Sequence, residues 1–540
     1  MMQAESERDI APLLTGDLLW DETVTKGLAE LWSQGRVVKV FEDAPTSLYA
    51  SLAATASRTP DATALIDDAS NRWTFAELRT HTDRFADRLA GDGIGPGDRV
   101  GLMLDTSPEF CAALYGANRI GAIVVPIPTK YKETEVRSML ERSEVAIVVA
   151  ADAFAHLVPD TIPVVEPAAI THCATARTGS EQAFSVDADA DAILMYTSGT
   201  TAASKGVMLT NRNVGHAIVA YQRILKITAN DSTIIPIPIY HITGMVALLG
   251  LFVHCGGTIF LHRRFDALRV LSTVRDGGVS FLHASPTVFA RLLEHAPEFP
   301  ELPTLRIMAC GAAHMPVSRI AALHQWLPGM DFRTVYGLTE TTSPGLIFPV
   351  DAAASPYCGS SGLPIPGMEV AILDEAGEAV PPGLTGEIWL RGTNLLRCYD
   401  QLTTISLRAD GWLNTGDVGH ANADGYVYIT DRTKDMINRG GEKVWCIDLE
   451  EALRQLPEVS DVAVIGIPDA TYGEVPVALI VPATASKVDP DAIRQAVRQV
   501  VAGYMVPAAV RVADALPVTA NLKVDKRAIR QLFAESNSEQ

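Results

Sequence analysis

The sequence is short of basic residues. Its 540 residues include 44 Lys and Arg against 64 Asp and Glu, which gives a formal net charge of −20 at pH 7. Proteins that bind nucleic acid neutralise phosphates with Lys and Arg, whereas an acidic chain of this kind repels them. We therefore expect no nucleic acid among its partners.

Cysteine is sparse as well, and long apolar runs are missing. The seven cysteines are odd in number and form no C-x-x-C pair, which argues against a disulfide framework and a zinc site. The most apolar window, residues 245–261, is interrupted by His254 and a Gly-Gly pair and is short for a bilayer span. It predicts a buried helix that runs into a strand. Since the acidic N-terminus also lacks a secretory signal, we expect a cytoplasmic protein without a membrane span.

Alternating strands and helices fill most of the chain. A chain of this length with 48% hydrophobic residues exceeds what one core supports, so at least two domains are expected. Residues 99–104 form a short apolar run typical of a buried strand, Ser107 and Pro108 are suited to begin a helix, and residues 122–127 form a second strand. This β-α-β order recurs further on. It predicts an α/β fold whose mostly parallel sheets are packed with helices.

A different pattern begins near the C-terminus. Two β-rich runs, 461–469 and 474–483, are flanked by helical stretches over 447–456 and 490–501. This arrangement predicts a separate, small α+β domain. The expected division is an N-terminal extension over residues 1–45, a large domain over 46–433 and the small domain over 434–540.

One loop in the large domain suggests a phosphate site. The segment "YTSGTTAASKGV", residues 196–207, follows a short apolar strand and offers hydroxyls, a glycine and a lysine. Such loops cradle polyphosphate with backbone N–H groups and a point charge. The P-loop motif of nucleotide triphosphatases is not matched, because Lys205 is preceded by Ser204 and followed by Gly206. On its own, the segment is also compatible with a Ser/Thr-rich surface turn.

The motifs that follow this loop narrow the interpretation. In order, they are "PIPIYHITG", "ACGAAHMP", "VYGLTETT", "NTGDVGHANADGYVYITDRTKD", "RGGEKVW" and "PVTANLKVDKR". From about Ser47 to Arg530, this succession resembles the adenylate-forming superfamily, and within it the acyl-CoA synthetases that act on fatty or aryl acids. The resemblance implies a large N-terminal domain and a mobile C-terminal one. It also implies that MgATP converts an apolar carboxylic acid to an acyl-adenylate, whose acyl group then passes to coenzyme A.

The resemblance assigns roles to residues of a nucleotide and metal site. Glu340 would hold Mg²⁺ as a hard oxygen ligand, and Lys523 would bridge the carboxylate and the α-phosphate; Thr197 joins them as the third catalytic residue. Asp417 suits the ribose hydroxyls and Arg432 the same sugar or its phosphate, although the two could instead form one structural salt bridge. The full nucleotide-binding set is Thr197, Ser198, Gly199, Thr200, Thr201, Lys205, Gly311, Ala312, Ala313, Tyr336, Gly337, Thr339, Asp417, Arg432 and Lys523.

Coenzyme A and the acid are also given sites by the resemblance. The face toward coenzyme A comprises Arg439, Gly440, Gly441, Glu442, Lys443 and Trp445, and Lys434 matches the hinge. Without the resemblance, Gly440 and Gly441 are a turn between a strand and a helix. The acyl pocket comprises His241, Met245, Gly311, Gly337 and Leu338. Small residues at Gly311 and Gly337 would admit a bulky apolar acid, while His241 is also compatible with a core histidine.

Three positions depart from the family pattern. Ala202 and Ser204 replace a glycine and a proline of the phosphate loop, and Leu522 replaces the glycine before Lys523. Each change costs about 0.4–3 kcal/mol, enough to slow adenylation by one or two orders of magnitude. A variant that only joins a supplied acyl-adenylate to coenzyme A is therefore an alternative. Another adenylate-forming enzyme or a non-catalytic binding protein is a second alternative, and a monomer and a homodimer are both compatible with the sequence.

Overall fold

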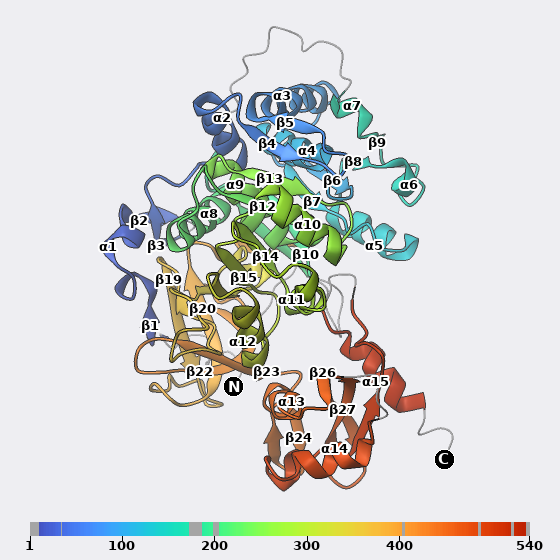
Figure 1. Cartoon of the computed structure of the whole chain (residues 1–540). Coiled ribbons are helices and arrows are strands. Elements are labelled where there is room, and N and C mark those ends of the chain that lie inside the picture. Colours follow the sequence, from blue (N-terminus) through green and yellow to red (C-terminus); the bar gives the residue numbers. More distant parts are fainter. Residues whose placement is uncertain are drawn as a thin grey trace.

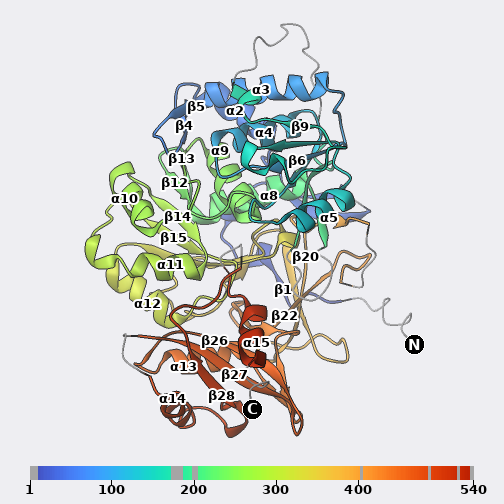
Figure 2. The ribbon, with the colours of Figure 1, turned by 90° about the vertical axis from the view of Figure 1, so that its right-hand side faces the viewer.

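The computed structural model describes residues 10–33, 35–171, 186–197, 205–401, 406–483, 488–519 and 523–535. Two large sheets, a smaller antiparallel sheet and their helices form the upper body in Figure 1, and a small C-terminal body in orange and red lies below it. Figure 2, turned by 90°, shows the same order, with the small body beneath the antiparallel sheet. The predicted α/β class with a large and a small domain is confirmed.

The first large sheet has seven strands in the order β21-β11-β10-β7-β6-β8-β9. Its strands are β6 (Arg99–Met103), β7 (Ile123–Pro126), β8 (Ile147–Ala150), β9 (Val164–Val165), β10 (Asp191–Tyr196), β11 (Gly206–Thr210) and β21 (Cys398–Tyr399). The predicted β-α-β unit is present, because β6 and β7 pair in parallel around α4 (Pro108–Arg119). Ser107 begins that helix by accepting a hydrogen bond from Phe110 N at 3.3 Å.

The second large sheet has nine strands in the order β18-β17-β16-β15-β14-β12-β13-β4-β5. They are β4 (Thr63–Ile66), β5 (Arg72–Thr74), β12 (Ser232–Ile235), β13 (Thr258–Leu261), β14 (Phe281–Ala284), β15 (Ile307–Cys310), β16 (Asp331–Tyr336), β17 (Leu346–Ile347) and β18 (Leu363–Pro364). The six strands from β4 to β16 pair in parallel, as expected. The window 245–261 is the predicted buried helix running into a strand: a π-helix (Thr243–Gly250) leads into α9 (Leu251–Cys255) and then β13.

A fully antiparallel sheet of five strands was not predicted. Its order is β1-β19-β20-β22-β23, with β1 (Leu14–Thr15), β19 (Met368–Leu373), β20 (Gly386–Gly392), β22 (Leu413–Ala421) and β23 (Val427–Arg432). The N-terminal segment takes part, because β1 pairs with β19, and a hairpin of β2 (Leu28–Ser33) and β3 (Arg36–Phe41) follows. This sheet carries Asp417 and Arg432 on adjacent strands.

Helices cover the sheets of the large body. They are α1 (Glu22–Thr25), α2 (Leu48–Arg58), α3 (Phe75–Gly91), α5 (Glu133–Ser143), α6 (Asp152–Ala155), α7 (Ala168–Thr171), α8 (Asn211–Leu225), α10 (Ala267–Gly277), α11 (Pro286–Leu293) and α12 (Val317–Trp326). Within the described ranges, none of the helices combines the length and the apolar content that crossing a bilayer requires.

The small body combines a sheet with three helices. Strands β24 (Ile437–Arg439), β25 (Glu442–Val444), β26 (Val459–Asp469), β27 (Gly473–Pro482) and β28 (Ala509–Val512) pack with α13 (Cys446–Arg454), α14 (Pro490–Val497) and α15 (Lys526–Glu535). Residues 433–436 link β23 of the large body to β24 of the small one, so Lys434 lies in this link. The domain limits at 45 and 433 stay predictions.

Polar contacts between described residues join the two bodies, among them a hydrogen bond of 2.5 Å from Cys446 N at the start of α13 to Asp431 Oδ2 of β23. Val317 N at the start of α12 donates to Glu451 Oε1 of α13 at 3.2 Å, and Arg319 pairs with Asp461 at 3.5 Å. Lys443 Nζ also lies 2.5 Å from Glu375 Oε1, in the turn after β19. This arrangement fixes which residues of the small body face the large one.

Candidate active site

Asp417 is the centre of the predicted nucleotide site. The register of β22 and β23 places it opposite Arg432, whose Nε donates to Asp417 Oδ1 at 2.8 Å. Tyr336, the last residue of β16, donates its hydroxyl to Asp417 Oδ2 at 2.6 Å. The structural salt bridge considered from the sequence is therefore present. That Asp417 binds the ribose stays a prediction. The salt bridge is compatible with this role, because each carboxylate oxygen has a second lone pair that can accept a hydrogen bond.

Burial and charge set the protonation of this group. Desolvation and the neighbouring Asp417 both raise the pKa of Tyr336 well above its usual value, so its hydroxyl stays a donor. Burial acts to lower the pKa of Arg432, but Asp417 outweighs it and the pKa is raised. A fixed guanidinium and a fixed phenol thus hold Asp417 in place.

Lys523 of the small body comes to the same group. It keeps more than a third of its surface exposed. The protein surrounding its ammonium nevertheless desolvates it and, with the nearby charge of Arg432, lowers its pKa to about 8. Asp417 and Glu340 act in the opposite direction on the same ammonium, so both carboxylates lie within its electrostatic reach. The structure thus brings together five predicted residues: Tyr336, Glu340, Asp417, Arg432 and Lys523.

This pKa predicts how acyl-adenylate formation depends on pH. The role predicted for Lys523, which is to neutralise two reacting anions, needs the protonated lysine. Its lowered pKa means that the ammonium is lost as pH rises through about 8. We expect kcat/KM for ATP to fall above that pH, well before an ordinary lysine titrates. Pyrophosphate exchange between pH 6.5 and 9.5 measures this. As a control, Lys523→Arg should remove the alkaline fall, because arginine stays charged throughout, and a fall retained in that variant would contradict the assignment.

Glu340 is held by a residue that the sequence motifs did not indicate. It lies in a short 3₁₀ turn (Thr339–Thr341) after β16, and Tyr399 on β21 donates its hydroxyl to Glu340 Oε1 at 3.0 Å. The Lys205 ammonium lies over the Tyr399 ring, 4.8 Å from its centre. Val207 of β11 pairs with Tyr399, and this register brings Lys205, two residues before Val207, to the Tyr399 ring. Sequence reasoning gave no local signal for Tyr399, because only the strand register places it there.

The donor set around Glu340 fits Mg²⁺. Its carboxylate is a hard oxygen ligand, and the bond from Tyr399 engages one oxygen only. Among the described residues, no cluster of three or more His, Cys, Asp or Glu side chains accompanies it. A single carboxylate suits this ion, because Mg²⁺ usually takes one or two carboxylates and completes its shell with phosphates and water.

Replacing Tyr399 by phenylalanine tests whether it positions Glu340. Loss of a hydrogen bond to a charged group costs about 1.5–3 kcal/mol, so we expect adenylation to slow by roughly tenfold or more. Because Glu340 is the predicted metal ligand, the half-maximal rate should also need more Mg²⁺. Pyrophosphate exchange over a Mg²⁺ titration measures both. Tyr357→Phe is the matched control, since Tyr357 donates to Asp424 at 2.7 Å on the surface, and equal effects in the two variants would argue against positioning.

The two ends of the predicted phosphate loop are close together. Thr197 N donates to Lys205 O at 3.0 Å, which closes the base of the loop between β10 and β11. Ser198, Gly199, Thr200 and Thr201 lie outside the described residues, as do Ala202, Ser204 and Leu522. Their predicted roles stay predictions.

Two of the predicted glycines have a packing reason to be small. A Cβ on Gly337 would lie 1.5 Å from Ser343 O, and one on Gly311 would lie 2.9 Å from Val335 O and 3.3 Å from His283 Nε2. The chain itself fills the direction of each missing Cβ; whether the two glycines also leave room for a bulky acid stays a prediction. Nearby, Ala312 (φ 71°), Thr342 (φ 54°) and Ser343 (φ 93°) have positive φ angles. Non-glycine residues of this kind are strained and cluster at functional sites.

The other predicted acyl-pocket residues lie around the π-helix and the turn after β16. Met245 is fully buried in the π-helix, and its N–H bonds to His241 O at 2.9 Å. π-Helices are rare and often occur at functional sites. Leu338 precedes the 3₁₀ turn and is half-buried. Whether these side chains touch an acid stays a prediction.

The predicted face for coenzyme A forms a tight turn in the small body. Gly440 (φ 63°) and Gly441 (φ 97°) join β24 to β25, where a side chain would be strained. Arg439 Nη1 donates to Tyr504 O at 2.7 Å and Val506 O at 3.2 Å, which ties the turn to its own domain. Glu442 is exposed beside it, and Trp445 is the residue before α13. The expected turn is present, but it joins two strands rather than a strand and a helix. Its contact with coenzyme A stays a prediction.

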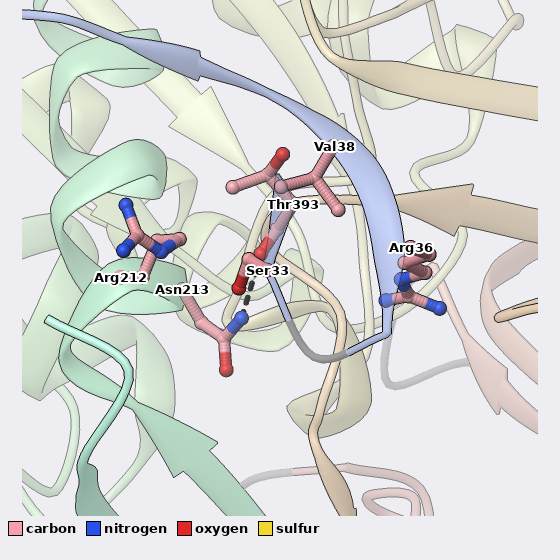
Figure 3. Close-up of a pocket in the computed structure, with 6 residues that line it drawn as sticks. All are labelled: Ser33, Arg36, Val38, Arg212, Asn213 and Thr393. Atoms are coloured by element: carbon pink, nitrogen blue, oxygen red, sulfur yellow. Dashed lines mark hydrogen bonds between the residues drawn. The ribbon is translucent and has the colours of Figure 1, made fainter. Parts of the chain in front are cut away.

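A small recess lies away from these residues. Ser33, Arg36, Val38, Arg212, Asn213 and Thr393 line a cavity of about 10 Å³ between the N-terminal hairpin and α8, shown in Figure 3. Asn213 Nδ2 donates to Thr393 O at 2.6 Å across it. A cavity of this volume holds about one water molecule, so it is not a substrate site.

Known proteins share this arrangement. A model of AMP-binding enzymes matches residues 52–400, and a model of their C-terminal domain matches residues 448–523. The chain belongs to the AMP-binding enzyme family. The fold and the enzyme class expected from the motifs are thereby confirmed: this AMP-binding enzyme is an AMP-forming acid–thiol ligase, with ATP and coenzyme A as co-substrates and Mg²⁺ as metal.

Alignments with individual relatives cover nearly the whole of this AMP-binding enzyme. A feruloyl-CoA synthase of Amycolatopsis is 33% identical over 492 residues, covering 88% of this chain and 97% of the relative. A 3-[(3aS,4S,7aS)-7a-methyl-1,5-dioxo-octahydro-1H-inden-4-yl]propanoyl:CoA ligase of Rhodococcus jostii is 32% identical, covering 90% and 99%. The o-succinylbenzoate CoA synthetase of Bacillus subtilis, solved with its acyl-adenylate, superposes with a TM-score of 0.79 at 29% identity, covering 89% and 97%.

Proposed function

We propose that this enzyme activates an apolar carboxylic acid with MgATP and itself completes the transfer to coenzyme A. The observation that carries the proposal is the approach of Lys523, from the small body, to Asp417, Arg432 and Glu340 of the large one. Glu340 lies within the matched residues 52–400 and Lys523 is the last of the matched residues 448–523, while Asp417 and Arg432 lie between the two matches. Their meeting is the arrangement that an adenylation step needs, because negative charge develops between the two reactants.

In the first step, a carboxylate oxygen attacks the α-phosphorus of ATP, and pyrophosphate leaves. The Lys523 ammonium neutralises the approaching oxygens, while Asp417 and Arg432 orient the sugar. Lys205 and the backbone of its loop bind the departing phosphates. Mg²⁺, when bound at Glu340, supplies charge neutralisation to the phosphate oxygens. Tyr399 links these parts, because it contacts both Glu340 and Lys205.

In the second step, the thiolate of coenzyme A attacks the acyl carbonyl carbon, and AMP leaves. We propose that rotation near Lys434 withdraws Lys523 and presents the turn at Gly440 and Gly441 to the pantetheine arm. The pKa of Lys434 is lowered by desolvation and then by Arg432, which marks it as part of the same crowded junction. Movement of Lys434 away from Arg432 would relieve the repulsion between their two positive charges. Small hinges of this kind absorb backbone rotation without touching substrate.

The relatives supply a substrate class. Their names contain a feruloyl group and a methyl-dioxo-octahydroindenyl propanoyl group, both cyclic. We propose an apolar acid of comparable bulk for this enzyme. A cytoplasmic location agrees with its six described cysteines, which are all free thiols. A monomer and a homodimer both remain compatible with the proposal.

A half-reaction enzyme is the second candidate. Ala202, Ser204 and Leu522 favour it, because all three replace family residues in parts used for adenylation. In that case the enzyme would accept a supplied acyl-adenylate and form the thioester only.

Mass spectrometry of acyl-CoA formation separates the two candidates. Apolar acids with MgATP and coenzyme A form one arm, and the corresponding synthetic acyl-adenylates with coenzyme A form the other. We expect product in both arms. Product from the acyl-adenylates alone would establish the half-reaction enzyme. If a broad panel that includes cyclic acids gave no product in either arm, the proposed activity would be wrong.

A further inference from the structure

His283 is a buried histidine whose hydrogen-bonding capacity is unused. It lies on β14 and is 1% exposed, with the rings of Phe281 and Tyr221 edge-on at 6.3 Å and 6.0 Å. Its Nδ1 is buried, and within the described part of the chain neither ring nitrogen makes a hydrogen bond. Burial lowers the pKa of His283 to about 3, so at neutral pH the ring has one N–H donor and one lone pair.

The other two histidines that are buried in the described part of the chain each use one ring nitrogen. His216 Nε2 lies 2.8 Å from Pro366 O and His262 Nε2 lies 3.1 Å from Thr273 Oγ1, although the Nδ1 of each is without a partner. A buried polar group without a partner costs about 1–3 kcal/mol. An apolar residue of similar size would avoid that cost at position 283, so the unpaired imidazole calls for a ligand or a water.

The position of the ring indicates which ligand. His283 pairs with Ala309 of β15 in a parallel register, near the carboxyl ends of both strands. Its Nε2 faces Gly311, where a Cβ would lie 3.3 Å away. Figures 1 and 2 show β14 and β15 side by side in the large body. Ligands of parallel sheets bind at the carboxyl ends of the strands, and Gly311 is one of the predicted acyl-pocket residues.

The polar ring neighbour of His283 is already engaged. The Tyr221 hydroxyl lies 2.9 Å from Ser343 Oγ and bonds to it, and both residues are buried. The other ring neighbour, Phe281, is apolar. Of these three rings, the imidazole is therefore the one that still has a donor and an acceptor to offer.

We propose that His283 forms the polar end of the acyl pocket and selects acids that carry a hydroxyl or ring carbonyl oxygen remote from the carboxylate. This inference rests on the proposed function. It refines the apolar acid to one with a second oxygen at its far end, which pairs with the imidazole. Such a site discriminates strongly, because the analogue without the oxygen leaves the ring buried and unpaired.

Matched pairs of acids that differ by one oxygen test the proposal. Suitable pairs are cinnamic and 4-hydroxycinnamic acid, and a fused bicyclic propanoic acid with and without a ring ketone. We expect the wild-type kcat/KM to favour the oxygenated member of at least one pair by about tenfold or more. His283→Leu should bring that ratio to about one, mainly because activity toward the oxygenated acid is lost. His283→Gln should keep part of the preference, because its amide can still form a hydrogen bond.

Two controls make the result specific. His262→Leu removes another buried histidine and should leave the ratio unchanged, while thermal unfolding reports whether each variant folds. If His283→Leu fails to fold, the same kcat/KM ratios are compared between His283→Phe and His283→Gln. A ratio near one in the wild type for every pair, or a preference that survives in the apolar variants, would overturn the proposal while the ligase activity stands. Absence of any acyl-CoA, also from acyl-adenylates, would instead refute the proposed function.

Discussion

Alanine in place of Lys523 is expected to slow acyl-adenylate formation by about 10²–10³-fold, the usual cost of removing one preorganised donor to a developing charge. The ammonium lies within reach of Asp417 and Glu340, and Arg432 is fixed by its ion pair with Asp417. The loss should appear in kcat and in kcat/KM alike, because the predicted bridge from Lys523 to the carboxylate and the α-phosphate would form in the transition state.

The same variant should retain the second step. In the proposed second step Lys523 is withdrawn before the thiol attacks, so acyl transfer from a supplied acyl-adenylate to coenzyme A should change by less than about threefold. Pyrophosphate exchange measures the first step and thioester formation the second. Lys132→Ala, an exposed lysine at the start of α5, controls for a change of net charge. Equal losses in both steps would show that Lys523 supports the fold, and unimpaired exchange would remove it from the catalytic set.

Local signals in the sequence predicted the parts of the fold that form locally. Ser107 and Pro108 mark the start of α4 because capping is decided within one helical turn. The window 245–261 showed a helix and a strand by its apolar length and its glycine pair. The C-terminal helix expected over 490–501 ends earlier, at Val497, because Val500 N and Val501 N both bond to Val497 O in a closing turn.

Long-range pairing could not be read in the same way. The five-stranded antiparallel sheet joins β1 to β19 across the length of the large body, and nothing in either short segment specifies the other. Tyr399 reaches Glu340 because β21 pairs with β11. In this pairing Tyr399 lies opposite Val207, which is some 190 positions earlier in the chain. His283 meets Gly311 through the β14–β15 register. Such positions depend on which strands are neighbours, and one sequence does not contain that information.

The chemistry of the candidate site was predicted better than its packing. Family motifs named Tyr336, Asp417 and Arg432, and the structure joins them through one carboxylate. The motifs gave no packing reason for Gly311 and Gly337, because a motif records which residue is present and not which atoms surround it. The backbone around Gly337 therefore yields the second large prediction.

Replacing Gly337 by alanine is expected to reduce adenylation by about 10²-fold or more, the usual effect of misplacing catalytic groups by about 1 Å. The added Cβ would lie 1.5 Å from Ser343 O, which is backbone and has no rotamer to change. Relief therefore requires a shift of residues 337–343, the segment that contains Glu340. That segment is tied elsewhere, since Leu396 N donates to Glu340 O at 2.7 Å, so the strain also destabilises the domain.

Two measurements and one matched variant test this expectation. Pyrophosphate exchange should show the loss of adenylation, and thermal unfolding should show a lower transition temperature, since overpacking a closed site costs about 1–3 kcal/mol. Gly329→Ala is the control, because nothing lies within 4 Å of its added Cβ, and it should change neither quantity. Normal exchange in the Gly337 variant would contradict this expectation, because it would mean that the turn from Gly337 to Ser343 shifts without displacing Glu340. The position of the carboxylate would then depend on Tyr399 and Leu396 and not on this backbone contact.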